Sequence, residues 1–355
     1  MRGMHIAVLT SGGDAPGMNA AIRTIAVAGI ARGHKVTGIR RGYQGLLEGD
    51  TTEITLPGIV GITHQGGTIL GSSRSAEFPT PEGQARARAR LAAMGADALV
   101  VIGGNGSLTG AHLLARERPC TIVGLPASID NDIGCSGLSI GVDSAVNTIV
   151  EACDRISDTA RAHRRAFIVE VMGRRCGFLA MRAGLAAEAD AILYGESGLG
   201  EDELVARLRE VLRRAFGPDG YKQRALIVKS EGVSVPAARL AKRLADHLID
   251  DAPGVDIRET VLGHVVRGGN PTALDRVIAQ RVGFAAVVGC ERGAHDVMMA
   301  WEPPGGAGAE TADPSVRAVP IAEVLAETER LLDGTSPVIR KRMELLSQVE
   351  HLLVA

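Results

Sequence analysis

Aromatic residues are scarce in this chain of 355 residues: they make up only 3% of it, whereas hydrophobic residues make up 45%. The core must therefore be built mainly from aliphatic side chains. An excess of charge of one sign is also lacking, because 39 basic residues are balanced by 41 acidic ones and the formal net charge is -2. This balance argues against a nucleic-acid partner held by bulk charge, although it leaves room for a local basic pocket.

Paired cysteines and long apolar runs are lacking as well. The five cysteines are odd in number and show no CxxC spacing, which favours reduced thiols over disulfides or a zinc site. No apolar run approaches 18 residues, and the apolar segment that starts at His5 is too short for a signal peptide. We therefore expect a cytoplasmic protein with no membrane partner.

Two common nucleotide-binding signatures are missing. No GxxxxGK[ST] occurs, which excludes a Walker-type phosphate loop, and the absence of GxGxxG counts against a dinucleotide site. Glycine is nevertheless abundant, with 45 residues, so many tight turns and close backbone approaches are expected.

Short apolar segments alternate with helical patterns along the chain. The expected strands are Ile6–Thr10, Val36–Arg40, Ala98–Ile102, Thr121–Leu125, Ala166–Val171 and Ala225–Lys229. The expected helices are Asn19–Ala31, Ser107–Arg116, Val142–Ala160, Gly177–Ala187, Glu201–Phe216, Pro236–Ile249 and Thr272–Cys290. This alternation is typical of βαβ units. It predicts an α/β fold of two doubly wound, Rossmann-like domains with mostly parallel sheets and a cleft between them.

We expect the first domain to comprise residues 1–141 plus 266–315 and to bind the nucleotide. The second domain, residues 142–265 plus 316–355, is expected to bind the other substrate. The stretch Pro303–Ser315 is rich in Pro and Gly and predicts a loop or linker.

A glycine-rich turn follows the strand that ends at Ile102. Its sequence, Gly103-Gly104-Asn105-Gly106-Ser107, supplies small residues and backbone amides, which suit an anion at the start of a helix. A plainer interpretation is a helix that Ser107 caps. The turn from Ser11 to Gly17 has the same character, and there an ordinary strand-to-helix turn is the favoured interpretation.

Two carboxylates follow the next strand, in the run Ser128-Ile129-Asp130-Asn131-Asp132. In an extended loop, alternate residues point the same way, so Asp130 and Asp132 are expected to share one site. One can accept a hydroxyl proton while the other holds magnesium. The alternative is a turn rich in Asx hydrogen bonds. Together with the glycine-rich turn, the pair suggests phosphoryl transfer.

Basic residues follow or precede the later strands. Arg174 comes directly after a buried strand, where a guanidinium can stabilise a transferring phosphoryl group or form a surface salt bridge. His264 and Arg267 lie three positions apart, a pair that suits a sugar phosphate, although a lone histidine is more often structural. Arg165 and Arg258 are expected just before strands, where each could be an ordinary cap or form an ordinary ion pair.

Taken together, these segments closely resemble the ATP-dependent 6-phosphofructokinases. The resemblance is carried by LTSGGDAPGMNAAIR, GGTILGSSR, ALVVIGGNGS, GLPASIDNDI, VEVMGRRCG and ETVLGHVVRGGNPTALDR. These strings run in family order from residue 9 to residue 276. The resemblance implies a cytoplasmic homotetramer with active sites shared between subunits. It also implies transfer of the γ-phosphoryl group of ATP to the 1-hydroxyl of fructose 6-phosphate, with Mg²⁺ as cofactor.

The resemblance also implies roles for single residues. The implied catalytic residues are Asp130 as the base, Ser128, and the arginines Arg74 and Arg174. The implied sugar-phosphate contacts are Ser128, Asp130, Met172, Gly173, Arg174, Glu231, His264 and Arg267, with Arg165 and Arg258 donated by a neighbouring subunit. The implied nucleotide contacts are Gly13, Tyr43, Arg74, Ser75, Gly104, Asn105, Gly106 and Ser107. Asp132 and Asn105 are the implied metal ligands.

Three departures from the family pattern stand out. Asn105 replaces a metal-associated aspartate, which removes one negative charge. Ala127 stands where ATP users commonly have glycine and pyrophosphate users lysine, and Gly106 stands where pyrophosphate users place an aspartate; both favour ATP. The basic effector pocket of regulated members is also depleted, because Val27, Ser157 and Gly220 occupy basic positions while Arg23 and Lys222 remain.

Three alternative functions follow from these patterns. The first is the same fold using pyrophosphate, which Gly106 and the missing lysine at 127 disfavour. The second is another kinase with a similar glycine-rich loop, such as an NAD kinase or a lipid kinase, which the strings around Met172 and His264 disfavour. The third is a non-catalytic regulatory homologue, which Asn105 favours and the retained Asp130 disfavours.

Overall fold

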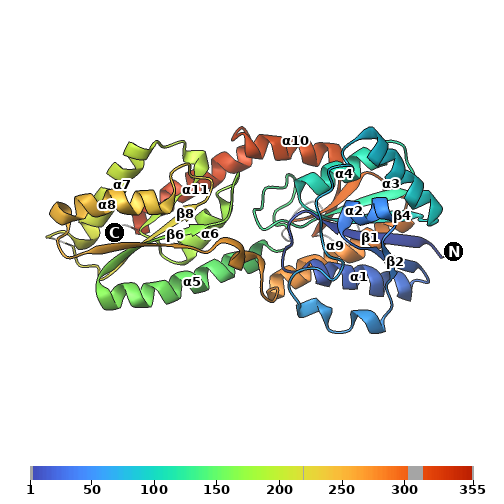
Figure 1. Cartoon of the computed structure of the whole chain (residues 1–355), viewed down its shortest axis with the longest axis horizontal. Helices are drawn as coiled ribbons and strands as arrows, with labels where there is room; N and C mark the ends of the chain where they lie inside the picture. Colours follow the sequence, from blue (N-terminus) through green and yellow to red (C-terminus); the bar gives the residue numbers. More distant parts are fainter. Residues whose placement is uncertain (1–2, 219, 303–314, 354–355) are drawn as a thin grey trace. The chain divides into compact units, whose positions relative to one another are not determined.

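The computed structural model describes residues 3–218, 220–302 and 315–353, and its contacts divide the chain into two units (Figure 1). Unit 1 comprises Met1–Ile129, Ile133–Ser144 and Arg267–Arg330. Unit 2 comprises Asp130–Asp132, Ala145–Val266 and Leu331–Ala355. Each unit is built around its own sheet, so each is described by itself.

The described residues of unit 1 form a seven-stranded sheet in the order β11-β10-β5-β4-β1-β2-β3. Its strands are β1 (His5–Ser11), β2 (Lys35–Ile39), β3 (Thr51–Glu53), β4 (Ala98–Gly103), β5 (Thr121–Pro126), β10 (Val297–Trp301) and β11 (Val316–Pro320). The pairs within the run β10-β5-β4-β1-β2 are parallel, whereas β3 and β11 pair antiparallel at the two edges. The central strands are buried runs of Val, Ile, Leu and Ala, as expected for a parallel sheet covered on both faces.

Helices cover both faces of this sheet (Figure 1). One face packs against α2 (Gly42–Glu48), α3 (Pro81–Ala93), α4 (Asn105–Ala115) and α10 (Ile321–Leu332). The other packs against α1 (Met18–Ala31) and α9 (Ala273–Glu291), which contact each other along their lengths. Short 3₁₀ turns lie at Pro57–Ile59 and Ile62–His64.

Unit 2 contains, within its described residues, a fully parallel sheet in the order β7-β8-β6-β9. Its strands are β6 (Arg165–Val171), β7 (Ala191–Leu193), β8 (Ala225–Ser230) and β9 (Asp256–Val261). Its helices are α6 (Phe178–Ala186), α7 (Glu201–Phe216), α8 (Ala237–Asp251) and α11 (Pro337–Leu353), with most of α5 (Val142–His163) and the 3₁₀ turns η3 (Gly195–Ser197) and η4 (Gly263–Arg267).

Alternate side chains of the unit 2 strands enter different layers. Ala191 and Leu193 face a core shared with α7 and α8, whereas Ile192 faces α6, where it packs against the backbone at Gly184. This alternation is the period-2 pattern of a strand buried on both sides. Unit 2 is therefore doubly wound like unit 1.

The six strands expected from the sequence are all present, and so are the seven helices, with ends shifted by a few residues. The α/β class with mostly parallel sheets is confirmed. The short or edge strands β3, β7, β9, β10 and β11 were not expected, nor were α2, α3, α10 and α11. Most of the expected linker, residues 303–314, lies outside the described residues.

The C-terminal domain boundary differs from the expected one. The sequence placed residues 316–355 in the second domain, but β11 pairs with β10 at the edge of the unit 1 sheet. As a result, Arg267–Arg330 belongs to unit 1, and only Leu331–Ala355 joins unit 2. The reason is that β11 completes an edge that hydrogen bonds with β10, a long-range pairing with no local sequence pattern.

None of the helices in the described ranges has both the length and the apolar character needed to cross a bilayer.

A buried carboxylate ties α9 to the loop before α5 within unit 1. Asp275 is 0% exposed and accepts hydrogen bonds from the Gly141 amide at 2.8 Å, the Ser144 amide at 2.7 Å and the Ser144 hydroxyl at 2.6 Å. Burial raises the pKa of the Asp275 carboxyl to about 6, although the hydrogen bonds from Ser144 and Gly141 act in the opposite direction.

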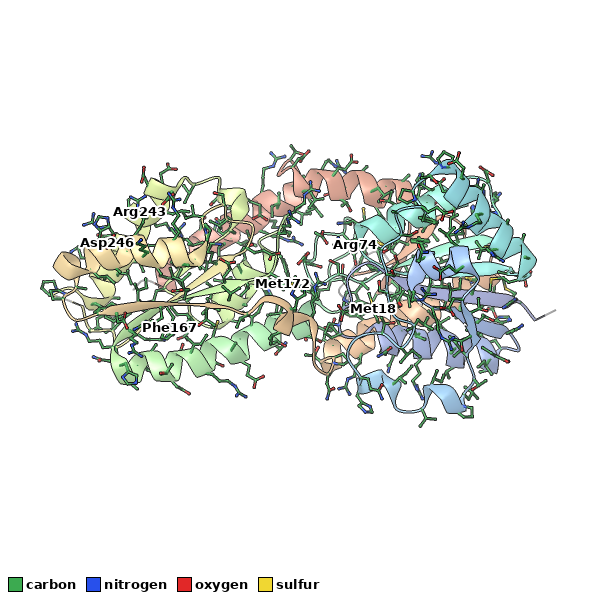
Figure 2. All side chains as sticks on the ribbon, in the orientation of Figure 1. Met18, Arg74, Phe167, Met172, Arg243 and Asp246 are labelled. Atoms are coloured by element: carbon green, nitrogen blue, oxygen red, sulfur yellow. The ribbon has the colours of Figure 1, made fainter. Side chains whose placement is uncertain are left out.

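We predict that Asp275→Ala destabilises unit 1 by about 2–4 kcal/mol, because two buried amides and one hydroxyl lose their acceptor. Urea unfolding followed by circular dichroism measures the change. Asp246→Ala is a suitable control, because Asp246 is exposed on α8 (Figure 2) and its loss should change the stability by less than about 0.5 kcal/mol. Equal stability of the Asp275→Ala protein and wild type would contradict the structural role of this carboxylate.

Candidate functional site

Three loops begin at the carboxyl edge of the unit 1 sheet. The strands β1, β4 and β5 are neighbours, and their last residues are in register, with Ser11 opposite Gly103 and Gly103 opposite Pro126. Each strand is followed by one of the segments predicted to carry the chemistry. Ligands of doubly wound sheets bind outside this edge, so the parallel register assembles the candidate site.

The glycine-rich turn after β4 forms the start of α4, with Gly104 as the N-cap and Asn105 as the first helical residue. The amides of the first helical turn are the ordinary anion-binding groups of such a turn. Ser107 is 3% exposed, which places its hydroxyl inside the turn rather than on the outer surface. Because Gly104 is the N-cap and Ser107 lies within α4, Ser107 is not the N-cap residue of this helix.

Two glycines of this turn have different surroundings. A Cβ on Gly103 would lie 2.4 Å from the Ser11 carbonyl oxygen and 2.5 Å from the Ser107 hydroxyl oxygen, so glycine is required there. A Cβ on Gly106 would meet nothing within 4 Å. Within unit 1, the space outside Gly106 is therefore open, as the sequence-based expectation of a nucleotide site requires.

Tyr43 stabilises this turn from its buried side. Its hydroxyl donates a hydrogen bond to the Ser107 carbonyl at 2.6 Å, and its ring stacks on Phe78 with a centroid separation of 3.9 Å. The residue is only 5% exposed, and burial raises the pKa of its phenol. The structure thus places Tyr43 behind the turn. Phe78 had no sequence signal, because the contact is made across a long loop.

The loop after β1 is held by two other segments of unit 1. The Ser72 hydroxyl donates to the Gly12 carbonyl at 2.5 Å, which brings the segment containing Arg74 and Ser75 to this edge. Arg267 donates to the Asp14 carbonyl at 3.1 Å, and a Cβ on Gly13 would lie 2.7 Å from its Nη1 atom.

Arg74 is exposed (Figure 2), and the Ser75 hydroxyl accepts a hydrogen bond from the Phe78 amide at 3.2 Å. Both residues therefore lie in a segment that is fixed locally, with the Arg74 side chain available to a ligand.

The segment after β5 carries the two predicted carboxylates. The Ala127 amide donates to the Gly103 carbonyl at 3.0 Å, which continues the sheet pairing to the start of this segment. Ser128, Asp130 and Asp132 are all half-buried. Asn131 has a φ of 49°, so the chain turns between the two carboxylates. The expectation of an extended loop is wrong at this residue, and the common direction of the two side chains cannot be argued from strand periodicity.

In unit 2, the predicted sugar-phosphate residues follow three neighbouring strands. Met172, Gly173 and Arg174 follow β6, Glu231 follows β8 and His264 lies in η4 after β9. Because β8, β6 and β9 are adjacent and parallel, these residues share the carboxyl edge of the sheet. Met172 is buried (Figure 2), whereas Arg174, Glu231 and His264 are exposed.

Backbone contacts fix the loops of this edge. The Glu231 amide donates to the Val171 carbonyl at 2.8 Å, and the Ser230 hydroxyl donates to the Gly173 carbonyl at 2.6 Å. Gly173 has a φ of 118°, a left-handed conformation that favours glycine. Arg174 therefore follows a backbone turn that is strongly constrained. Arg267, by contrast, belongs to unit 1.

Arg165 and Arg258 both form ion pairs with the same carboxylate, that of Asp256. Asp256 is paired with Arg165 in the register of β6 and β9, and its Oδ2 lies 3.4 Å from Arg165 Nε and 2.7 Å from Arg258 Nη2. The ordinary ion pairs considered from the sequence are therefore present. Asp256 had no signal in the sequence, because only the strand pairing brings it to both arginines.

A metal site made by the protein alone is absent from the described ranges, which contain no group of three or more His, Cys, Asp or Glu side chains able to hold an ion. This fits Mg²⁺, which is usually bound through one or two carboxylates and the phosphates of a substrate. The side-chain oxygens of Asp132 and Asn105, the two residues expected to hold the metal, are of the type that Mg²⁺ prefers.

The lysine that remains from the expected effector pocket, Lys222, takes part in an ion-pair cluster of unit 2. Lys222 and Arg224 both contact Asp190, at 2.7 Å and 3.3 Å, and Ser157 is 4% exposed. On unit 1, Arg23 and Val27 are half-buried on α1. The remaining cation at Lys222 is therefore already paired.

Comparisons with known proteins agree on one family. The family model described as phosphofructokinase matches residues 5–290. A protein of Thermotoga neapolitana named ATP-dependent 6-phosphofructokinase is 48% identical over 83% of this chain and 89% of its own length. The protein of Thermus thermophilus named ATP-dependent 6-phosphofructokinase 1 is 45% identical over 83% of this chain and 88% of its own length.

Solved structures agree with this result. The phosphofructokinase of Saccharomyces cerevisiae is similar with a TM-score of 0.84 and 33% identity over 97% of this chain, which spans about half, 50%, of the yeast chain. A pyrophosphate-dependent phosphofructokinase from Marinobacter aquaeolei has a TM-score of 0.77 at 21% identity, over 97% of this chain and 91% of its own length. The second likeness concerns the fold alone.

We predict that alanine at the two glycines of the turn changes the free energy of unfolding by different amounts. Gly103→Ala should destabilise the protein by about 2 kcal/mol or more, because its Cβ overlaps the Ser11 carbonyl. Gly106→Ala should change the stability by less than about 1 kcal/mol, because the position is open and helical. Urea unfolding of both variants beside wild type tests the pair. A Gly106→Ala protein as unstable as Gly103→Ala would show that the space outside Gly106 is filled.

Proposed function

The chain belongs to the phosphofructokinase family, and we propose that it is an ATP-dependent 6-phosphofructokinase of glycolysis. The reaction transfers the γ-phosphoryl group of ATP to the 1-hydroxyl of fructose 6-phosphate and yields ADP and fructose 1,6-bisphosphate. The match to the family model carries this proposal, because the matched residues, 5–290, include the loops at both sheet edges described above. A coupled assay of the purified protein with fructose 6-phosphate, comparing ATP with pyrophosphate, tests it directly.

In this proposal, Asp130 accepts the proton of the 1-hydroxyl as the sugar oxygen attacks the phosphoryl group. Ser128 lies two residues before it and contacts the transferring phosphoryl group. Arg74 and Arg174 stabilise the negative charge of that group. Support comes from the chemistry of phosphoryl transfer, in which catalysis consists mainly of positioning and charge stabilisation, and from the exposure of both guanidinium groups.

The sugar phosphate is proposed to contact the carboxyl edge of the unit 2 sheet. Met172, Gly173, Glu231 and His264 of that edge are its proposed contacts, together with Arg267 of unit 1. The constrained turn at Gly173 supports this role, because it fixes the backbone that a sugar would contact.

The active site is proposed to be completed by a neighbouring subunit in a homotetramer. Arg165 and Arg258 would reach from that subunit to the 6-phosphate. Asp256 holds both side chains at one place in the chain. Two guanidinium groups held together suit a phosphate dianion, which they would bind in exchange for part of their contact with Asp256. Light scattering of the purified protein measures the assembly state, and a cytoplasmic location fits the same proposal.

The nucleotide is proposed to bind the carboxyl edge of the unit 1 sheet. Gly13, Gly104, Gly106, Ser107 and the Arg74–Ser75 segment would contact it. Tyr43 would act through its hydrogen bond to the Ser107 carbonyl. Asp132 and Asn105 would hold the Mg²⁺ of the nucleotide, which supplies positive charge to the phosphates.

The open space outside Gly106 supports ATP over pyrophosphate as the phosphoryl donor. An aspartate there would project a carboxylate into that space and repel the phosphates, whereas glycine leaves it free. Position 127 also offers no ammonium group to a pyrophosphate. Faster turnover with pyrophosphate than with ATP at equal concentration would overturn this choice of donor.

We predict that Asp130→Ser lowers kcat by at least about 100-fold, the scale of a positioned base, with little change in the KM for fructose 6-phosphate. Asp14→Ser is a control, because Asp14 offers its backbone carbonyl to Arg267, while its side chain has no hydrogen bond or ion pair within the described ranges. Turnover of the Asp130→Ser protein within a few-fold of wild type would contradict the role of a general base.

We predict that Asn105→Asp lowers the Mg²⁺ concentration for half-maximal rate, because it adds a negative charge beside the proposed metal position. Initial rates over a magnesium titration, together with magnesium-ADP affinity, measure the effect. Wild-type turnover with the same magnesium curve in both proteins would place residue 105 away from the metal. A wild type without turnover at any magnesium concentration would favour the non-catalytic homologue.

A further inference from the structure

A cavity of about 400 Å³ lies in unit 2 on the side of Arg174 that faces the C-terminal helix. Its volume falls in the range of small-molecule sites. It shares Gly173 and Arg174 with the residues proposed for the sugar phosphate, but Glu231 and His264 do not line it. Instead, its other walls come from η3 and from the turn between α10 and α11. The cavity is therefore a separate space that adjoins the proposed site through one guanidinium.

Three arginines line this cavity: Arg174 and Arg175 from the loop after β6, and Arg340 from α11. All three are exposed. In the described part of the chain, no carboxylate forms an ion pair with any of them, and Arg340 donates instead to the Thr335 carbonyl at 2.6 Å. Like charges collected around one space repel one another, so an anion bound there would relieve a repulsion that the protein compensates only in part.

The two carboxylates that line the cavity already accept hydrogen bonds from nearby amides and a hydroxyl. Glu196 accepts a hydrogen bond from the Gly177 amide at 2.7 Å. Asp333 accepts the Thr335 amide at 2.9 Å and the Thr335 hydroxyl at 2.6 Å. The lining therefore combines three guanidinium groups with two carboxylates that already accept hydrogen bonds, and its net charge is positive.

A fourth arginine stands behind the wall of the cavity. Arg342 of α11 lies over the Phe178 ring, 4.6 Å from its centroid, and Cys176, a lining residue, is near enough to act on its pKa. Its Nη1 atom is buried and has no hydrogen-bond partner among the residues that the structure describes. Burial lowers the pKa of Arg342, while burial raises that of the Cys176 thiol to about 12, so the thiol stays protonated and brings no compensating charge.

We propose that this cavity binds a small phosphate-bearing anion that competes with the reaction for the guanidinium of Arg174. Arginine groups recognise phosphate oxygens through paired N–H donors, and Met343 and Leu332 supply an apolar wall for an organic part. The inhibitory role rests on the proposed function, because it needs Arg174 to act in phosphoryl transfer. The binding itself does not need it.

Calorimetric titration of the full chain with inorganic phosphate, without ATP or sugar, tests the binding. Arg340→Gln removes one cavity guanidinium from outside the proposed catalytic set, and we expect it to weaken phosphate binding at least about five-fold. Lys341→Gln is the matched control: it removes the same charge from the next residue of α11, which is exposed and does not line the cavity. We expect it to change the affinity less than two-fold.

Equal phosphate affinities of Arg340→Gln and Lys341→Gln would overturn the proposal. Arg175→Gln, on a different element, is a second variant with the same expected loss, so a poorly folded Arg340→Gln protein leaves the test decisive. Glycerol 3-phosphate serves as the other probe. Tighter binding than inorganic phosphate supports a phosphomonoester as occupant, and equal binding supports recognition of the phosphate group alone.

Inhibition of turnover by inorganic phosphate provides the second measurement. We expect it to weaken at least about five-fold in Arg340→Gln relative to Lys341→Gln. An active enzyme whose inhibition is the same in both variants would overturn the inference and leave the proposed function standing. Failure of the kinase assay with intact phosphate binding at the cavity would overturn the proposed function, and with it the inhibitory role, but would leave the binding site standing.

Discussion

The close approach of β1 and β4 at their carboxyl ends is the constraint on which the proposed nucleotide site depends. Gly103 faces the Ser11 carbonyl so closely that a Cβ would lie 2.4 Å from the oxygen. This contact allows β4 to end directly against β1 and to turn at once into α4. The first turn of that helix then reaches the sheet edge, where Tyr43 supports it through the Ser107 carbonyl. A wider separation would move the amides of the turn away from the loop after β1.

The same principle organises unit 2 with different residues. The parallel pairing of β8, β6 and β9 brings Glu231, Arg174 and His264 to one edge, although they are far apart in the sequence. Hydrogen bonds from the Glu231 amide and the Ser230 hydroxyl then fix the loop that precedes Arg174. The charged side chains of this edge stay exposed while their backbone is held, which suits groups that must meet a charged substrate without reorganising.

Arg174 has two environments in unit 2. It follows the sheet edge proposed for the sugar phosphate, and it also lines a cavity closed by α11. Residues 331–353 return to unit 2 after the chain has completed the unit 1 sheet with β11. The C-terminal segment therefore brings Arg340 and Arg342 to the back of a loop that comes from the middle of the chain. A ligand in the cavity would connect this segment to the proposed chemistry through one side chain.

The sequence by itself determined the α/β class, the six central strands and the positions of the loops that follow them, because these depend on local apolar runs and glycine turns. It also indicated the family, because six motifs occur in order. It did not predict the edge strands β3 and β11 or the end of the unit 1 segment at Arg330. Nor did it predict the turn at Asn131 or the position of Tyr43 behind the glycine-rich turn. Only the tertiary structure decided that Asp256 joins Arg165 to Arg258 and that Arg340 reaches the loop of Arg174. These contacts join residues distant in the chain, and strand pairing and helix packing, which leave no local pattern, bring them together.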